Sequence, residues 1–330
     1  MNEAKVGRFL TRTLKKITVS ALLAGVVGGA AAQEGFPVRP ITIVVGSQAG
    51  SAPDVLARIL AVEMGASLKQ SIIVENKPGA TGSIGAGYVA SAQPDGYTLL
   101  MGTVSNIALA PLGKSVRYNA ADFTTVSAVA SVPLVMLTGA DAQVHDLADL
   151  KQLAAKTSGG LAFSSPGIGG PQHLAGLLLQ KELGIPLLHV PYKSGGAAAL
   201  AVASGETQFT FAGVSAAIPL ISSKKVAPVF VTAPARLEAL PAVPSALQIK
   251  APDFLVDNWH GLFAPKNLPE SVRSKLADAV HKALQSASVQ QKFNGLGAQV
   301  DLRDAAQYSQ FVRQESDRWA RIVKENGLTL

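Results

Sequence analysis

The 330-residue chain contains no cysteine. This absence excludes disulfide frameworks, thiolate zinc sites and cysteine nucleophiles. Charged residues are also scarce, at 15%, whereas hydrophobic residues make up 48%. A composition of this kind argues against intrinsic disorder and predicts a well-buried globular protein, long enough for two domains.

Long hydrophobic runs are missing except near the N-terminus. A basic stretch is followed by the short apolar run 17–27, which ends in small residues, with Ala30 and Ala32 in an A-x-A pattern. These features predict a Sec-type signal peptide over residues 1–32, cleaved near Ala32. The basic stretch has no pair of adjacent arginines, so a twin-arginine signal is not expected. A retained membrane anchor is the alternative, but the run is short and rich in Gly and Ala. We expect a soluble periplasmic protein.

A strong charge of one sign is missing once the signal is removed. The whole chain has 29 basic and 22 acidic side chains. Residues 1–32 carry five of the basic and one of the acidic side chains, which leaves 24 against 21, a net charge of +3. This weak excess suits an anionic small ligand and is poor evidence for a nucleic-acid partner.

Strands and helices are predicted to alternate along the mature chain. Continuous apolar runs are followed by short turns and then by residues with helical periodicity. This alternation predicts an α/β fold with mainly parallel sheets covered by helices. The clearest predicted elements are strands at 41–45, 71–75 and 161–165 and helices at 54–68, 171–183, 270–286 and 304–325.

Two strand–loop–helix units, at 41–68 and 161–183, predict two lobes. We place residues 37–135 and 255–330 in the first lobe and residues 136–254 in the second, so that the chain crosses between them twice. Ligands of open α/β sheets bind beyond the carboxyl ends of the strands. We therefore expect both loops to face one cleft.

The first of these loops follows the run "ITIVV". The string Ser51-Ala52-Pro53-Asp54 fits a capping box, in which the Ser51 hydroxyl accepts from the Asp54 N–H and the Asp54 carboxylate accepts from the Ser51 N–H. A capped helix is a sufficient explanation of this string. The functional alternative is that residues 47–51 offer unpaired N–H groups and a positive helix end to an anion.

Nucleotide-binding motifs fail on inspection. No G-x-x-x-x-G-K-[ST] string exists, and "GSIGAG" at Gly82–Gly87 reverses the Rossmann spacing, so we assign it to turn and helix packing. Metal ligation is disfavoured as well. The five histidines are widely scattered without ligand-like spacing: His145, His173, His189, His260 and His281.

A serine hydrolase is a weaker hypothesis. Ser164 or Ser165 with His173 would form a nucleophile and base, but no orienting acid is apparent. "GVSAA" at Gly213 lacks the second glycine of a nucleophile elbow.

Several ordered strings resemble one family. "FPVRPITIVV", "AGSAPDVLARIL", "VENKPGATGSIGA", "PDGYTLLMGT", "SSPGIGGPQHLAG", "HVPYKSGG", "LPAVPS" and "GLFAPKNLPE" are similar to those of the periplasmic substrate-binding proteins of tripartite tricarboxylate transporters, the Bug or TctC family. The resemblance covers about residues 37–330. It implies a two-lobed Venus-flytrap protein, without catalysis or cofactor, that closes on a small organic carboxylate. It also implies delivery to a permease complex of a large and a small membrane subunit, and we expect a monomer.

The resemblance also implies a ligand site formed by both lobes. In the family, the loop after the first strand and the loop before the second-lobe helix hold carboxylates through backbone N–H groups and water. With Asp54 as the helix cap, the implied ligand-binding residues are Ser47, Gln48, Ala49, Gly50, Ser51, Thr103, Ser105, Asn106, Ser164, Ser165, Gly167, Gly169, Gln172, His173, Ala212 and Gly213.

This chain departs from the family pattern at the ligand loops. It has "GSQAGS" at 46–51 where relatives usually have proline and an aromatic residue, and Ala212-Gly213 where they often have Asp-Asn. The departures remove side-chain partners, although Gln48, Ser105 and Asn106 offer replacements. We therefore expect a carboxylate whose remaining part is less polar than an amino acid. A sensor that works without a transporter stays an alternative.

Overall fold

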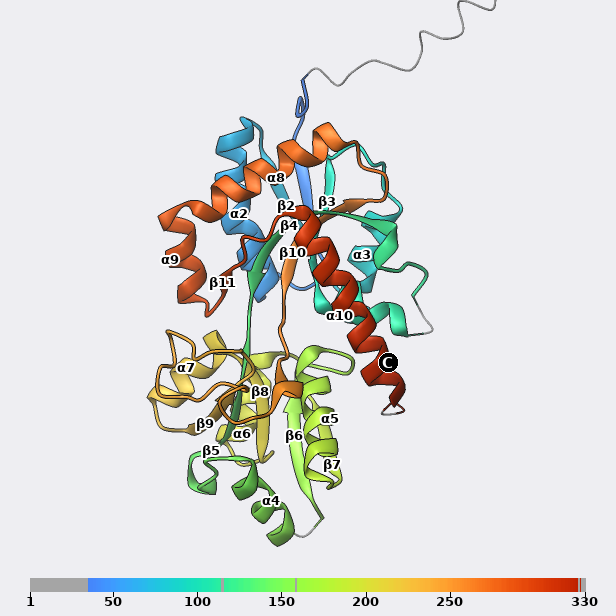
Figure 1. The fold of residues 1–330 in the computed structure, drawn as a ribbon. Helices are drawn as coiled ribbons and strands as arrows, with labels where there is room; N and C mark the ends of the chain where they lie inside the picture. Colours follow the sequence, from blue (N-terminus) through green and yellow to red (C-terminus); the bar gives the residue numbers. More distant parts are fainter. Residues whose placement is uncertain (1–34, 114–115, 158, 326, 328–330) are drawn as a thin grey trace, which may run out of the picture. The chain divides into compact units, whose positions relative to one another are not determined.

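The computed structural model describes residues 35–113, 116–157, 159–325 and 327. The predicted signal peptide, residues 1–32, lies outside them. Residues 39–330 form one compact unit, to which the description below applies. Its strands form two sheets, one of six strands and one of five, and each carries its own helices (Figure 1). The predicted α/β fold with two sheets is confirmed.

The first sheet has the order β11-β4-β10-β3-β1-β2. Strand β1 (Ile41–Val45) pairs in parallel with β2 (Ile72–Asn76) and β3 (Thr98–Thr103). Strand β10 (His260–Pro265) runs antiparallel to β3 and β4 (Phe123–Ser131), and the short β11 (Gln299–Val300) is antiparallel to β4. The sheet is therefore mixed and not mainly parallel, because β10, which returns from the other lobe, and β11 run opposite to the other four strands.

Helices cover both faces of the first sheet. Helix α2 (Ala52–Leu68) packs against α8 (Glu270–Gln285) and α9 (Ala287–Gly295). Helix α3 (Ser83–Ala90) and α10 (Ala305–Glu325) contact the π-helical turn η3 (Val104–Leu109). Tyr308 of α10 lies so close to Gly261 of β10 that a Cβ there would be 2.2 Å from its ring. Short 3₁₀ turns follow at η2 (Ala80–Gly82), η4 (Ala110–Leu112) and η5 (Ala120–Asp122).

The second sheet has the order β7-β6-β8-β5-β9. Strand β6 (Leu161–Ser165) is parallel to β7 (Leu187–Pro191) and β8 (Phe209–Gly213), whereas β5 (Leu134–Gly139) is antiparallel to β8 and β9 (Val226–Val231). The helices of this lobe are α4 (Leu147–Lys156), α5 (Pro171–Leu183), α6 (Gly195–Ala203) and α7 (Val214–Ser222), with short turns η6 (Ala140–Ala142) and η7 (Pro252–Phe254). Buried Phe163, Phe209, Phe211 and Phe230 fill the space between them.

The chain passes between the sheets twice, after β4 and again before β10. Thr232 joins the two passages: its hydroxyl accepts from Leu134 N at 2.8 Å and donates to Val256 O at 2.6 Å. Oδ1 of the buried Asp257 accepts from Val132 N at 3.0 Å. The two passages thus form one hydrogen-bonded hinge. No helix in the described residues combines the length and apolar character needed to cross a bilayer.

Candidate functional site

The loop after β1 is held by the carboxylate of Asp54. Asp54 is 2% exposed and its Oδ2 accepts from the N–H of Gly50 at 2.9 Å. Ser51 occupies the N-cap position of α2, but its side chain makes no capping hydrogen bond, and its N–H donates to Gln48 O. The predicted capping box is therefore wrong. Asp54 does anchor this helix end, but through Gly50 and not through Ser51.

Asn76 and Arg58 complete this anchor. Asn76 Nδ2 donates to Asp54 Oδ1 at 2.9 Å and to Ser47 O at 3.0 Å, and Arg58 Nε donates to both carboxylate oxygens. Burial raises the pKa of Asp54, but hydrogen bonds from Arg58, Gly50 and Asn76 outweigh it and hold the pKa below its ordinary value. The loop is thus tied down by a charged Asp54.

Three N–H groups of this loop have no acceptor among the described residues: those of Ser47, Gln48 and Ala49. The N–H groups of Gly50 and Ser51, which the resemblance placed in the ligand set, are already used within the loop. The hydroxyls of Ser47 and Ser51 bind each other at 2.6 Å. Because only one of the two protons lies in that bond, one hydroxyl donor remains.

The glycine-rich segment after β2 packs directly under this loop. A Cβ at Gly46 would lie 2.7 Å from Gly82 O, and one at Gly85 would lie 3.1 Å from Gly46 Cα. These positions require glycine because two backbones touch there. The assignment of "GSIGAG" to turn and helix packing is consistent with these contacts.

The end of β3 contributes a second edge of the site. Thr103 and Asn106 form a reciprocal cap, with Thr103 N donating to Asn106 Oδ1 at 2.8 Å and Asn106 N donating to Thr103 Oγ1. Asn106 is buried and structural, whereas the Ser105 hydroxyl makes no hydrogen bond in the described residues. Of the predicted replacement partners, the side chains of Gln48 and Ser105 have no hydrogen bond in the described residues, whereas Asn106 uses its Oδ1 in the cap and keeps only its Nδ2 donor.

The second-lobe loop, residues 166–170, connects β6 to α5. Ser165 Oγ donates to Gly167 O at 2.8 Å and accepts from Gly167 N at 3.2 Å. Gly169 N donates to His173 Nδ1 at 3.2 Å. The N–H groups of Gly167 and Gly169, both predicted to meet the ligand, are therefore used inside the loop. Those of Ile168, Gly170, Gln172 and His173 have no acceptor in the described residues.

The serine–histidine pair of the hydrolase hypothesis is not formed. Ser164 is fully buried, and its hydroxyl donates to Ala198 O at 2.8 Å. The hydroxyl of Ser165 lies 2.7 Å from His189 Nε2, not from His173. Sequence reasoning missed His189, since only the β6–β7 register, which aligns Phe163 with His189, brings it under the loop.

The two residues at the end of β8 have different surroundings. Ala212 is buried in the core of the second lobe and does not face open space. Gly213 is the N-cap residue of α7 without a side-chain cap, and a Cβ there would meet nothing within 4 Å. Of the predicted pair, only Gly213 is placed to border a ligand.

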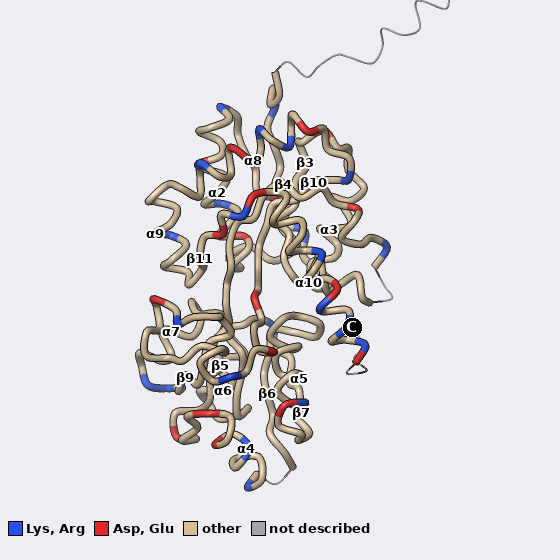
Figure 2. Tube along the Cα trace, in the orientation of Figure 1, with Lys and Arg blue, Asp and Glu red and all other residues tan. Residues whose placement is uncertain are grey.

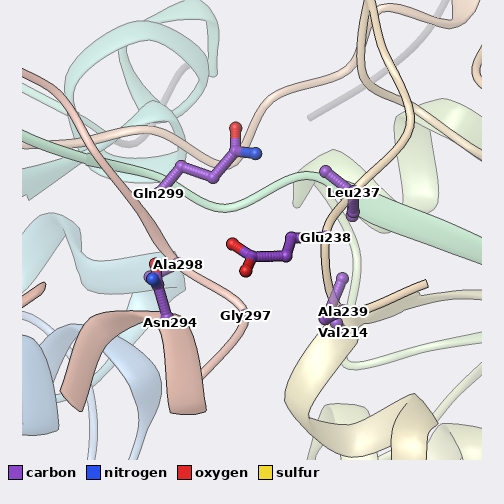
Figure 3. Close-up of a pocket in the computed structure, with 8 residues that line it drawn as sticks. All are labelled: Val214, Leu237, Glu238, Ala239, Asn294, Gly297, Ala298 and Gln299. Atoms are coloured by element: carbon purple, nitrogen blue, oxygen red, sulfur yellow. The ribbon is translucent and has the colours of Figure 1, made fainter. Parts of the chain in front are cut away.

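A pocket of about 280 Å³ is lined by residues of both lobes, among them Val214, which follows Gly213 in the chain. Val214 and Leu237–Ala239 line it from the second lobe, and Asn294 and Gly297–Gln299 line it from the first. The side chain of Glu238 extends into the pocket (Figure 3). Gly297 packs so closely on Val214 that a Cβ would lie 2.5 Å from the Cβ of Val214. The lobes therefore touch here.

The two loops predicted to bind the ligand are also neighbours across the lobes. Thr81 Oγ1, beside the first loop, donates to Ile168 O of the second loop at 3.5 Å.

Lys, Arg, Asp and Glu are interspersed along the trace of both lobes (Figure 2). Within the described residues no three His, Asp or Glu side chains gather as a metal site would need. The arrangement presents mainly backbone N–H donors.

Comparison with known proteins identifies relatives over nearly the whole chain. Residues 56–328 match the model of the tripartite tricarboxylate transporter family receptor. Protein BugT of Bordetella pertussis is 31% identical over 327 residues, which is 97% of this chain and 99% of that protein.

Two similar solved structures contain ligands. The MatC protein of Rhodopseudomonas palustris with bound malate is 31% identical, with a TM-score of 0.78 over 87% of this chain and 100% of that chain. R. palustris Rpa4515 with adipate is 28% identical, with a TM-score of 0.80 over 89% of this chain and 99% of that chain.

Proposed function

The chain belongs to the tripartite tricarboxylate transporter receptor family of solute-binding proteins, and we propose that it captures a small organic dicarboxylate between its two loops. The observation that carries this proposal is the set of N–H groups without acceptors at the starts of α2 and α5. Donors at helix N-termini suit a carboxylate, since the helix dipole adds to the hydrogen bonds.

The pairing of the loops supports a ligand with two acidic ends. Ser47, Gln48 and Ala49 offer N–H groups from one lobe, while Ile168 and Gly170 offer them from the other. Malate and adipate, held by two relatives, are both dicarboxylates. A dicarboxylate bound to both loops would favour the closed arrangement of the lobes, because only that arrangement supplies both sets of donors.

The ligand preference follows from the side chains that are absent. Gly213 brings no polar group to the end of β8, and Ala212 is buried. An amino or hydroxyl substituent on the acid would find no partner there and would lose its hydration. We therefore propose an unsubstituted dicarboxylate such as adipate over aspartate or glutamate.

Export and delivery complete the proposal. The protein works in the periplasm after removal of residues 1–32, and passes its ligand to a membrane permease with a large and a small subunit. It performs no reaction. The proton of Ser165 is donated to Gly167 O, so this serine is not activated as a nucleophile.

Isothermal titration calorimetry with succinate, adipate, malate, aspartate and glutamate tests the proposal. We expect the unsubstituted acids to bind more tightly than the amino acids. Tight, selective binding of aspartate or glutamate would contradict the preference, and no binding of any acid would contradict the function. Native mass spectrometry of protein purified from its own periplasm identifies a retained ligand independently.

A further inference from the structure

Two histidines lie beneath the second-lobe loop. The ring centroids of His173, on α5, and His189, on β7, are 4.1 Å apart. Phe163 of β6 packs on both, at 6.2 Å from His173 and 4.9 Å from His189. Gly176 allows this stack, because a Cβ there would lie 2.1 Å from the Phe163 ring. The stack forms a floor under residues 166–170.

Each ring is linked by hydrogen bonds to one glycine of the loop, His173 directly and His189 through Ser165. His173 Nδ1 accepts from Gly169 N, and His189 Nε2 contacts Ser165 Oγ, which in turn binds both backbone groups of Gly167. Gly167 and Gly169 have φ angles of +142° and +77°. Since side chains other than glycine rarely adopt these angles, the loop needs both its glycines and its two anchors.

Proton counting fixes the form of both rings. Ser165 has one hydroxyl proton, and Gly167 O can only accept, so that proton lies between Ser165 Oγ and Gly167 O. His189 Nε2 must then donate to Ser165 Oγ. His173 Nδ1 accepts from Gly169, so its proton is on Nε2. His173 is therefore the neutral Nε2–H tautomer, and His189, whose burial disfavours a second proton, is one as well.

The surroundings favour these neutral forms. Burial lowers the pKa of His173 to about 4, with a further contribution from His189, and burial also lowers the pKa of His189. No carboxylate of the described residues forms an ion pair with either ring. A protonated His173 would direct an N–H at the N–H of Gly169, which breaks the anchor.

We propose that His173 and His189 are positioning residues of the ligand site. In this inference, which rests on the proposed function, His173 holds Gly169 and His189 holds Gly167 through Ser165. The two anchors use up the N–H groups of Gly167 and Gly169, so the loop offers those of Ile168, Gly170 and Gln172 to the carboxylate. Neither imidazole touches the ligand.

Paired substitutions separate this role from simple packing. His173→Asn keeps an acceptor near the Nδ1 position, whereas His173→Leu keeps the bulk and removes the acceptor. His189→Gln keeps a donor near the Nε2 position, whereas His189→Leu removes it. Proton–nitrogen NMR of the ligand-free proteins follows the amides of residues 167–170 and the imidazole nitrogens. Calorimetry with adipate and succinate then measures affinity.

We expect Nε2–H tautomers for both rings in the wild-type protein. His173→Leu should change the chemical shift of the Gly169 amide and make its proton exchange faster. Binding should weaken about tenfold, because one hydrogen bond is lost and the loop is less ordered. His173→Asn should restore the Gly169 amide signal and bring the affinity to within about threefold of wild type. In the same way, His189→Leu should disturb the Gly167 amide and weaken binding, and His189→Gln should restore both properties.

Equal behaviour of Asn and Leu at 173, or an unchanged Gly169 amide in His173→Leu, would overturn the inference. These amide and tautomer results do not need a ligand. A wild-type protein that binds no acid therefore rejects the proposed function separately, and with it any role of these anchors in binding.

Discussion

The carboxylate of Asp54 lies 2.9 Å from the backbone N–H of Gly50. This hydrogen bond holds the loop between β1 and α2 against the first turn of α2. It uses the Gly50 N–H and leaves those of Ser47, Gln48 and Ala49 without acceptors. The N–H groups that the first loop offers therefore depend on Asp54, a buried acid that is not itself exposed at the proposed site.

Asp54→Ala should destabilise the protein and weaken ligand binding. It leaves Gly50 N and the Asn76 amide without their acceptor, and we expect a loss of about 2–4 kcal/mol of unfolding free energy. Asp54→Asn should cost less because one oxygen acceptor remains. Urea unfolding measures both. The exposed pair of Glu270 and Arg273 gives a control, since Glu270→Ala should cost only about 0–1 kcal/mol; equal losses in the two Ala variants would contradict the anchor.

Thr232 should be critical for the hinge. Thr232→Val keeps the shape but leaves Leu134 N and Val256 O unpaired in a buried position. We expect a loss of about 2–4 kcal/mol, since each buried unpaired group costs about 1–3 kcal/mol. Thr232→Ser keeps the hydroxyl and should lose less than half as much. Thermal and urea unfolding measure both variants. Equal losses of unfolding free energy in Thr232→Ser and Thr232→Val would contradict the role of the hydroxyl in the hinge.

Stability should fall on acidification between pH 6 and 5. Burial lowers the pKa of His173 and of His260 to about 4, so the unfolded chain binds a proton at each that the native state does not. Burial raises the pKa of Asp257 to about 7, so the native state holds one proton that unfolding releases. Burial also lowers the pKa of His189, which adds uptake of the same sign, so the net uptake is at least about one proton, or about 1.4 kcal/mol per pH unit.

Two variants check the signs of these contributions in urea unfolding at several pH values. His260→Phe removes one proton uptake and should flatten the dependence on pH. Asp257→Asn removes the opposing release and should make it steeper, by about one proton. A dependence that is unchanged in both variants would show that other groups determine acid stability.

Gly213→Asn should change ligand preference without harming the fold. The position has φ −64° and ψ 144° at the start of α7, and a Cβ meets no atom within 4 Å. Asn is a good N-cap residue, so stability should stay equal or rise by a few tenths of a kcal/mol. A new polar group should improve the ratio of aspartate to adipate affinity about fivefold, the effect of one hydrogen bond. An unchanged ratio would place the ligand away from β8.

The sequence predicted the parallel part of the fold accurately. Periodicity and turn residues placed β1, β6 and α5 to the residue. It did not predict β4, β5 and β10, the antiparallel strands around the hinge, because their apolar runs carry no local sign of direction or partner. Their pairing is set by contacts between segments far apart in the sequence, such as Thr138 with Phe209 and Leu262 with Ser127.

The site was predicted at the level of loops and less well at the level of atoms. The glycine patterns located the loops at 46–51 and 166–170, but local motifs do not say which N–H groups the loop itself uses. Asp54 was assigned to Ser51 because the capping-box spacing matched, yet the turn at Gly50 brings a different N–H to the carboxylate. His189 carries no signal at all before the β6–β7 register is known.

Amide chemical-shift mapping with the tightest-binding acid of the calorimetric panel tests the central claim most directly. The largest shifts should fall on Gln48 and Ala49 in the first lobe and on Ile168 and Gly170 in the second. Gly50 and Gly169, whose N–H groups are already bonded, should shift less. Shifts confined to the pocket around Glu238, or to one lobe only, would contradict a carboxylate held between the two loops.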